Sequence, residues 1–471
     1  MIKKWILAAT VITLVYCSSA PELTTKDIPV KLLGYVTAVS GGDSLQILDD
    51  VIHVSPGTKL QMKGGPSIAF RDVGSGMLAD VRGIRTGRHR FEAERITFDW
   101  DQFGREIHRS AYLEEEPAPT EGTSGAQPSR LRVDGELLVL DGNTKWTWDP
   151  NEPQASSPIA VPGPGLVGRL LSYRGVRQDD GTIAAQEVEI GGFPPPDAFQ
   201  IPNEVSISLG KDSKGGVQFV EFHHKEKRLN TYAEKLLIHE ETLQGAPLPG
   251  RKKVLPLQEV QDYVSQLGSK LVPAVEPGSA RPAAAFRFIV VEEPAIYAVS
   301  FPDGTVLVTA GLLAALENEA QLAFVLSHEI SHTLQAHCWR QWEDTRGIRA
   351  FFTRSSAFSS ASEVEMMILV PPLGWVWDGY PPQMENQADR LAVENLVVRG
   401  YDPHQALSLL RIMIKYNGSA IWSNHDWSVL RGSFLSVQIQ RRYPTGQFDH
   451  ATVSTQAFDS MRDALGPVKV E

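Results

Sequence analysis

The chain has 471 residues, a length that indicates two or three domains rather than one core. Hydrophobic residues make up 42% of the chain, which favours a packed globular protein and excludes general disorder. The formal net charge is −11 and the basic residues are scattered, so no nucleic-acid partner is expected.

The N-terminus has the pattern of an export signal, which we place at residues 1–20. Lys3 and Lys4 precede an apolar run at residues 5–16 that is short for a membrane span and typical of a signal peptide. Cys17 and the two serines after it resemble a lipoprotein signal, although Tyr16 stands where a small residue is usual. Lipidation of Cys17, plain secretion and an uncleaved anchor remain open. Each predicts an exported protein of the periplasm or cell envelope, in contact with a membrane surface if it is anchored.

The first half of the chain contains a repeat. Residues 81–98 (VRGIRTGRHRFEAERITF) align without gaps on residues 173–190 (YRGVRQDDGTIAAQEVEI), an offset of 92, and the same offset places residues 45–50 on 137–142. Short alternating apolar runs separated by Gly, Asp and Asn predict strands and turns. We therefore expect two small all-β modules, at residues 28–112 and 130–193, with a flexible acidic linker at residues 113–129. Nothing in them indicates catalysis, and a spacer or a binding module with an unknown partner is the interpretation.

After residue 204 the pattern changes to alternating helices and short strands. Residues 257–272 have helical periodicity, and residues 286–293 and 304–311 predict strands. Helical segments follow, the first of which begins at Asn318 or Glu319, and Gly400 ends the second. The predicted fold class is a multidomain α+β protein. Two duplicated all-β modules precede a mainly helical domain with a small β-sheet at residues 204–471.

The segment VLSHEISHTLQAH, residues 325–337, carries the chemistry. His328 and His332 lie four residues apart, so on a helix both imidazoles can face one ion. Glu329 can reach the open coordination position, where it can take a proton from a water and pass it to a leaving amine. A zinc ion suits this arrangement because it acidifies its water and polarises a carbonyl. The alternative is a pair of hydrogen-bonded helix histidines without a metal.

The third ligand distinguishes the classes of zinc peptidase. In one class it is a histidine six residues after the second, a position that is held here by Cys338. In the gluzincin class a glutamate on a later helix is the third ligand, and an aspartate four residues on supports a ligand histidine. The segment ENQAD has that form, and Glu385 and Asp389 share a helical face, so one can bind zinc while the other orients an imidazole. Other divalent ions remain open for this ligand set.

Residues 260–445 resemble the HtpX-like metallopeptidase family of gluzincins, which includes the type-1 CAAX prenyl protease and a branch of soluble, BepA-like envelope proteases. Four blocks carry the resemblance in order: YAVSFPDGTVLVTAGLL at 297–313, ENEAQLAFVLSHEISHTLQAH at 317–337, GYPPQMENQAD at 379–389 and GSFLSVQIQRR at 432–442.

The resemblance implies one zinc ion per chain, bound by His328, His332 and Glu385, with Glu329 as general base and Asp389 behind the ligands. It also implies that an extended substrate pairs with one strand. The residues of that strand are Gly304, Thr305, Val306, Leu307, Val308 and Thr309.

The chain departs from the family pattern at three places. Tyr297 replaces an asparagine, and two prolines at residues 381–382 replace a Ser-Arg pair. Phe434 and its neighbour at residue 435 replace a His-Pro pair, which removes an imidazole that can stabilise an oxyanion. Arg441 or His425 could substitute for it, or the enzyme could be slow.

Residues 345–382 are apolar and interrupted by prolines, and core packing, a lid and a membrane-touching loop all remain open for them. The leading hypothesis is a zinc-dependent metalloendopeptidase of the bacterial envelope that acts on polypeptide substrates. The alternative is a zinc-bearing, chaperone-like or binding protein with weak or latent peptidase activity, in which the β modules do the main work.

Overall fold

The computed structural model describes thirteen segments of the chain, and the statements below are confined to them: residues 28–100, 102–113, 129–152, 166–178, 180–195, 198, 205–211, 217–224, 251–273, 286–341, 380–417, 429–444 and 446–468. The predicted export signal with Cys17, the linker at 114–128, residues 345–379 and His425 lie outside the described residues.

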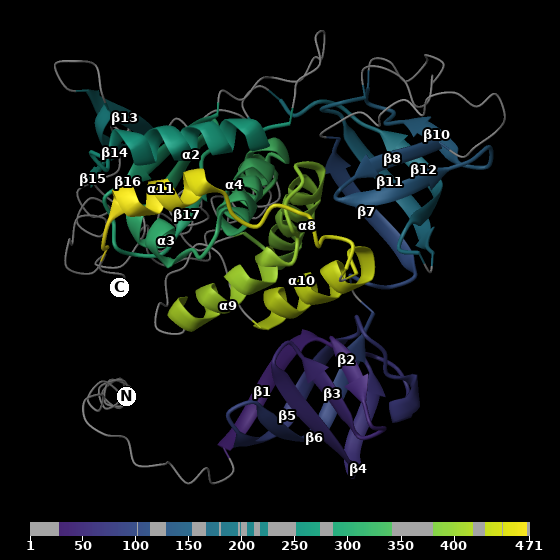
Figure 1. The fold of residues 1–471 in the computed structure, drawn as a ribbon. Coiled ribbons are helices and arrows are strands. Elements are labelled where there is room, and N and C mark those ends of the chain that lie inside the picture. Colours follow the sequence, from purple (N-terminus) through teal and green to yellow (C-terminus); the bar gives the residue numbers. More distant parts are fainter. Residues whose placement is uncertain are drawn as a thin grey trace, which may run out of the picture.

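The first β module is a six-stranded sheet that curls around its own core (Figure 1). In the order in which they pair, its strands are β1 (Ile28–Tyr35), β5 (Leu78–Gly87), β6 (Arg90–Asp99), β4 (Asp50–Met62), β3 (Ser44–Ile47) and β2 (Ala38–Ser40), with a short 3-10 helix η1 at Phe70–Asp72. Alternate residues of β5 and β6 face inward, as the apolar alternation predicts, and bury Val81, Ile96 and Phe98.

The second β module begins earlier than predicted. Its strands are β7 (Glu106–Tyr112), β11 (Leu170–Arg177), β12 (Ile183–Ile190), β9 (Glu136–Leu140) and β8 (Ser129–Val133), with β10 (Lys145–Trp148) paired to β12. The predicted boundary at residue 112 is therefore wrong, because β7 pairs with β11 of the second sheet and not with the first. It holds the place that β1 holds in the first module, antiparallel to the first strand of the repeated hairpin.

The repeat is present in the strand pairing, but one of its two predicted alignments is wrong. Phe91 and Ile183 are 92 residues apart, whereas their parallel partners Ile52 and Leu138 are 86 apart. The earlier hairpin of each module therefore corresponds at an offset of 86. The alignment of residues 45–50 on 137–142 is displaced by six residues, because the second module has six more residues between its parallel-paired strands than the first.

The C-terminal part is mainly helical and carries two small sheets. The helices are α2 (Gln258–Leu271), α3 (Ala310–Ala315), α4 (Glu319–Leu334), α8 (Pro382–Val398), α9 (Gln405–Asn417), α10 (Val429–Arg442) and α11 (Gln456–Leu465). One sheet contains β13 (Val205–Lys211), β14 (Val217–His224) and β15 (Arg251–Lys253); the other contains β16 (Arg287–Val291), β18 (Thr305–Thr309) and β17 (Ala298–Ser300). The predicted α+β class is thus confirmed. None of the helices in the described part of the chain has the length and apolarity to cross a membrane.

Strand β18 is the central strand of its sheet. It pairs in parallel with β16 on one side and antiparallel with β17 on the other, and all five of its residues are buried. The prediction that an extended substrate pairs with Thr305–Thr309 is therefore wrong, because both hydrogen-bonding edges of this strand are already used. Strand β17 stands at the edge of the sheet.

Both β modules dock on the helical region through the ends of equivalent strands. The backbone N–H of Tyr35, at the end of β1, donates to Ser433 Oγ of α10 at 2.8 Å. The backbone N–H of Tyr112, at the end of β7, donates to Gln335 Oε1 at 2.8 Å, directly after α4. The Gln335 side chain also donates to the Tyr112 carbonyl at 2.8 Å, so it pairs with the strand end as another strand would.

Glu136 of β9 is fully buried among three arginines at the boundary between the second module and α10. Its carboxylate lies 2.8 Å from Arg109, 3.0 Å from Arg177 and 3.9 Å from Arg442. Burial alone would raise the pKa of Glu136, but the three positive charges outweigh it and lower the pKa to about 2.

Because the folded pKa of Glu136 is about 2 and its ordinary value is 4.5, its ion pairs stabilise the fold fully above pH 4.5 and are lost as the pH falls toward 2. Glu136→Gln should lower the free energy of unfolding at pH 7 by about 3–5 kcal/mol, since it breaks a buried ionic cluster. The stability of this variant should also depend less on pH within that window. Denaturant unfolding at pH 7, 4.5 and 3 measures both effects, and equal pH dependence of the two proteins would contradict the assignment.

Candidate metal centre

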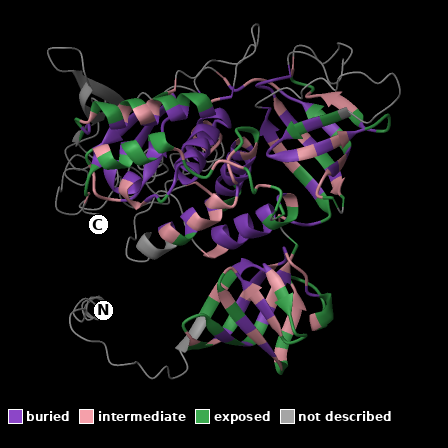
Figure 2. Ribbon diagram, viewed as in Figure 1, coloured by how far each residue is buried: buried purple, intermediate pink, exposed green. Residues whose placement is uncertain are grey.

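Helix α4 places two histidines on one face inside the helical region. Asn318 caps its start by accepting a hydrogen bond from the Gln321 backbone at 3.0 Å, which agrees with one of the two predicted starts. Every residue of α4 is buried, and Figure 2 shows both α4 and the neighbouring α8 enclosed by other elements. His328 and His332 are one helical turn apart, so their ring nitrogens converge.

Helix α8 brings the predicted third ligand beside α4. It begins at Pro382, whose fixed φ suits the first helical position, and Gly400 with φ +81° follows its C-cap. This start places Glu385 in the first turn of α8, with 2% of its surface exposed.

The three predicted ligand atoms form a compact triangle. His328 Nε2 lies 2.9 Å from His332 Nε2 and 3.4 Å from Glu385 Oε2, and His332 Nε2 lies 3.6 Å from Glu385 Oε1. Tetrahedral zinc with ligand bonds of about 2.0–2.1 Å requires ligand atoms roughly 3.3 Å apart. Within the described residues these three form the one group of His, Cys, Asp or Glu side chains with the spacing of a metal site. The residues therefore fit zinc in both number and separation.

His328 has an acidic partner behind it. Its Nδ1 lies 3.0 Å from Asp389 Oδ1, and since a carboxylate only accepts, Nδ1 carries the proton and Nε2 keeps its lone pair for a metal. Burial would raise the pKa of Asp389, but the charge and hydrogen bonds of Arg431, together with the hydrogen bond from His328, hold it below its ordinary value.

Arg431 of α10 is a residue of this centre that the sequence reasoning missed. It binds both oxygens of Asp389, at 2.6 and 2.7 Å, and its Nη1 lies 2.7 Å from Glu385 Oε2. Only 3% of its surface is exposed. Its position one turn before Phe434 on an amphipathic helix was only a weak indication that Arg431 is buried. The sequence alone does not show which face of the helix points inward.

Arg431→Gln should destabilise the metal-free protein by about 3–5 kcal/mol, because it leaves two buried carboxylates without their cation. Bound zinc should reduce this loss, since the metal charge also neutralises Glu385. Denaturant unfolding with excess chelator and with excess zinc measures the difference. Arg411→Gln, which removes an exposed pair with Asp49, is the control and should cost about 0–1 kcal/mol. An equal loss for Arg431→Gln with and without zinc would contradict this role.

His332 has two aromatic neighbours, neither of which was assigned a role from the sequence. Its Nδ1 lies 2.8 Å from His337 Nδ1, and the Tyr380 ring stacks on it with centroids 4.3 Å apart. Burial, followed by the charge of Arg340, lowers the pKa of His337 to about 3. Burial, with added effects from Cys338, Glu329 and Glu385, raises the pKa of Tyr380 well above its ordinary value, so its hydroxyl keeps its proton.

Two other predicted site residues, Glu329 and Arg441, lie in different parts of the structure. Glu329 lies on α4 beside the ligand triangle with 2% of its surface exposed. Arg441, predicted as an oxyanion stabiliser, instead donates to the Ser75 carbonyl of the first β module and lies over the Phe103 ring. That prediction is wrong, because Arg441 is ten residues and nearly three turns beyond Arg431 on α10, which carries it away from the ligands.

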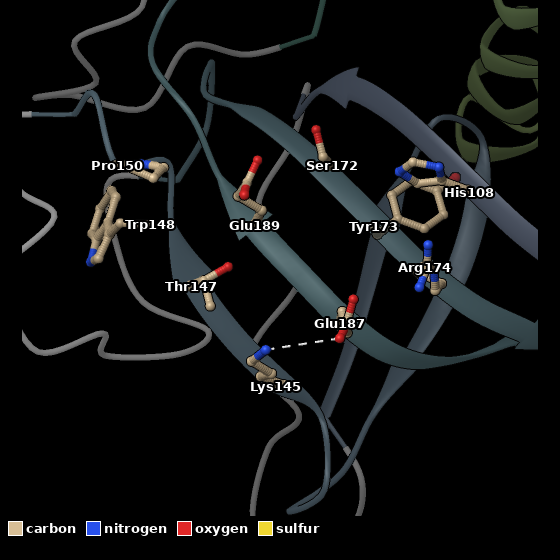
Figure 3. A pocket seen from close by; sticks show the side chains of 10 residues that line it. All are labelled: His108, Lys145, Thr147, Trp148, Pro150, Ser172, Tyr173, Arg174, Glu187 and Glu189. Carbon is tan, nitrogen blue, oxygen red and sulfur yellow. Dashed lines mark ion pairs between the residues drawn. The ribbon is translucent and has the colours of Figure 1, made fainter.

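A separate hollow of about 410 Å³ lies on the outer face of the second β module, formed by side chains of β7, β10, β11 and β12 (Figure 3). Lys145 and Glu187, which form an ion pair at 3.9 Å, line it together with Trp148 and Pro150. None of the three ligand residues lines it, so it is distinct from the metal centre.

Two regions of the chain match known protein families. Residues 259–438 match Peptidase family M48, and residues 34–97 match a domain of unknown function, DUF5666. The first match spans α4, α8 and most of α10, and the second lies within the first β module.

Three curated relatives match part of the chain. The chain is 29% identical over 161 residues to the Beta-barrel assembly-enhancing protease of Escherichia coli K12 and 30% identical over 157 residues to that of Yersinia pestis, which in both cases covers 32% of this chain and 32% of the relative. It is 27% identical over 142 residues to the Mitochondrial metalloendopeptidase OMA1 of Arabidopsis thaliana, covering 29% of this chain and 27% of that protein.

The chain thus spans about a third of the length of the curated relatives it matches. The M48 match at residues 259–438 contains the helices that carry His328, His332, Glu385 and Asp389. Residues 259–438 are therefore a peptidase family M48 domain, homologous to that of the beta-barrel assembly-enhancing proteases.

Proposed function

We propose that the chain is a zinc-dependent metalloendopeptidase that hydrolyses polypeptides in the cell envelope. The observation that carries the proposal is the buried triangle of His328, His332 and Glu385, with Glu329 beside it on the same helix as the two histidines. The M48 match and the relatives named as proteases support the reaction class. The N-terminal signal pattern supports export, with Cys17 as the residue that would be lipidated.

Each residue of the centre has a distinct task. His328, His332 and Glu385 would hold the zinc ion, which when bound supplies a Lewis acid for the scissile carbonyl and acidifies a water molecule. Glu329 would take the proton of the attacking water and deliver it to the leaving amine nitrogen. Asp389 and Arg431 hold the His328 ring in place from behind. No covalent intermediate forms, because water itself attacks.

The proposal is tested by digestion of a mixture of unlabelled peptides with purified protein, followed by mass spectrometry of the products. New internal termini should form with the wild type and disappear when a chelator is added. Digestion that continues at the same rate in excess chelator would show that the hydrolysis does not depend on a metal.

A further inference from the structure

A continuous line of buried hydrogen-bonding groups joins the second β module to a predicted metal ligand. Asp134, in the turn between β8 and β9, accepts from Gln387 Nε2 of α8 at 2.8 Å. Gln387 Oε1 lies 2.9 Å from His337 Nε2, and His337 Nδ1 lies 2.8 Å from His332 Nδ1. None of the four side chains is more than 5% exposed, so water does not compete for these contacts.

The turn is held firmly against α8. Gly135 has φ +62°, and a Cβ there would lie 2.8 Å from the Arg390 backbone, so a side chain would push the turn away. Arg390 Nε donates to the Asp134 carbonyl at 3.1 Å and its Nη2 to the carboxylate at 2.6 Å. The position of the Asp134 carboxylate is therefore fixed relative to Gln387.

The fixed carboxylate sets the direction of the hydrogen bonds from the module toward the metal centre. A carboxylate only accepts, so the Gln387 amide must point its NH₂ group at Asp134 and its oxygen at His337. That oxygen also accepts from Arg340 at 2.9 Å, which favours the same orientation. His337 must then donate from Nε2.

The metal centre requires the same directions from its own end. If Nε2 of His332 binds a metal, its proton is on Nδ1, and that proton must be donated. The acceptor within reach is His337 Nδ1, which is free to accept when the His337 proton is on Nε2. The Asp134 carboxylate and the metal-binding nitrogen of His332 therefore require the same position for every proton along this line of groups.

We propose that Asp134 is a positioning residue that sets the tautomer of the ligand His332 through Gln387 and His337. The inference rests on the proposed zinc site. It gives the second β module a role in the reaction: its turn supplies to His332 the carboxylate that Asp389 supplies to His328 directly. The Asp134 carboxylate acts on His332 through two intervening side chains, Gln387 and His337. It belongs to the second β module, whereas Asp389 belongs to the neighbouring helix α8.

The sharpest test compares Asp134→Asn with Glu136→Gln. Both replace a buried carboxylate of the same hairpin by its amide, and both remove one charge from the same arginine cluster, but only Asp134 contacts Gln387. In Asp134→Asn the new amide offers both a donor and an acceptor, so residue 134 no longer fixes the Gln387 amide, whose orientation then rests on Arg340 and the Ser110 carbonyl. Zinc affinity is measured by competition with a chromophoric chelator, and the unfolding transition of each metal-free protein is measured in parallel.

Asp134→Asn should weaken zinc binding by about 10–100-fold, and Glu136→Gln should leave it unchanged. Equal zinc affinity in Asp134→Asn and the wild type would overturn the inference, as would an equal loss in both variants, which would show a general effect of module stability. A wild type that binds no zinc would instead contradict the proposed function itself.

A second pair keeps the inference testable if Asp134→Asn does not fold. Gln387→Met has a similar length and removes both donor and acceptor, whereas Gln387→Glu keeps an acceptor for His337 Nε2 and for Arg340. Gln387→Met should lose about 10–100-fold in zinc affinity, and Gln387→Glu should lose less. Gln387→Met with wild-type zinc affinity would overturn the inference.

Discussion

Glu329→Gln is expected to reduce peptide hydrolysis by a factor of about 10²–10⁴ while zinc binding is retained. Glutamine has nearly the same shape as glutamate, but its amide cannot take the proton of the attacking water. Glu329 is not among the three ligand atoms of the triangle, so its loss leaves the metal in place. The measurement is the rate of product formation by mass spectrometry, with zinc content determined on the same sample.

Glu317→Gln is the matched control for this variant, because Glu317 is an exposed glutamate just before the same helix. It should cleave at the wild-type rate. If Glu329→Gln also cleaves at that rate with its zinc retained, the proposed general base is wrong and another group must accept the proton.

Glu385→Ala should weaken zinc binding by more than the roughly 10–100-fold that loss of a supporting partner costs, because it removes a ligand. Two imidazoles would then remain, one fewer protein ligand than a catalytic zinc site uses. Chelator competition measures the affinity, and hydrolysis should fall with the fraction of protein that carries zinc.

Gln383→Ala is the control for Glu385→Ala, since Gln383 is exposed in the same first turn of α8. It should bind zinc as the wild type does. Unchanged zinc affinity in Glu385→Ala would place the third ligand elsewhere in the chain.

Spacing within single helices was enough to predict the inner part of the centre. His328 and His332 share a face of α4, and Glu385 and Asp389 share a face of α8, because residues four apart on a helix point the same way. The contact between the two helices was not readable from spacing; it was inferred from a resemblance. The start of α4 was also predicted, since Asn318 is a preferred N-cap residue, whereas the prolines at residues 381–382, where α8 begins, were interpreted only as a departure from the family pattern.

Contacts between distant segments could not be predicted in the same way. Arg431 enters from α10, and Asp134 enters from a hairpin in another module, so no local pattern connects either of them with the histidines. A fully buried strand such as β18 shows no alternation, and its sequence therefore does not reveal whether it is central or at an edge. The six-residue difference between the two β modules was hidden because one hairpin keeps the offset of 92.

X-ray absorption at the zinc edge of the zinc-loaded wild type tests the central claim most directly, because it reports the ligand atoms themselves. The arrangement of His328, His332 and Glu385 predicts only nitrogen and oxygen neighbours at about 2.0–2.2 Å, with the scattering of two imidazoles. A sulfur neighbour at about 2.3 Å would have to come from one of the two cysteines, and a third imidazole could come from His337. Either result would contradict the proposed centre.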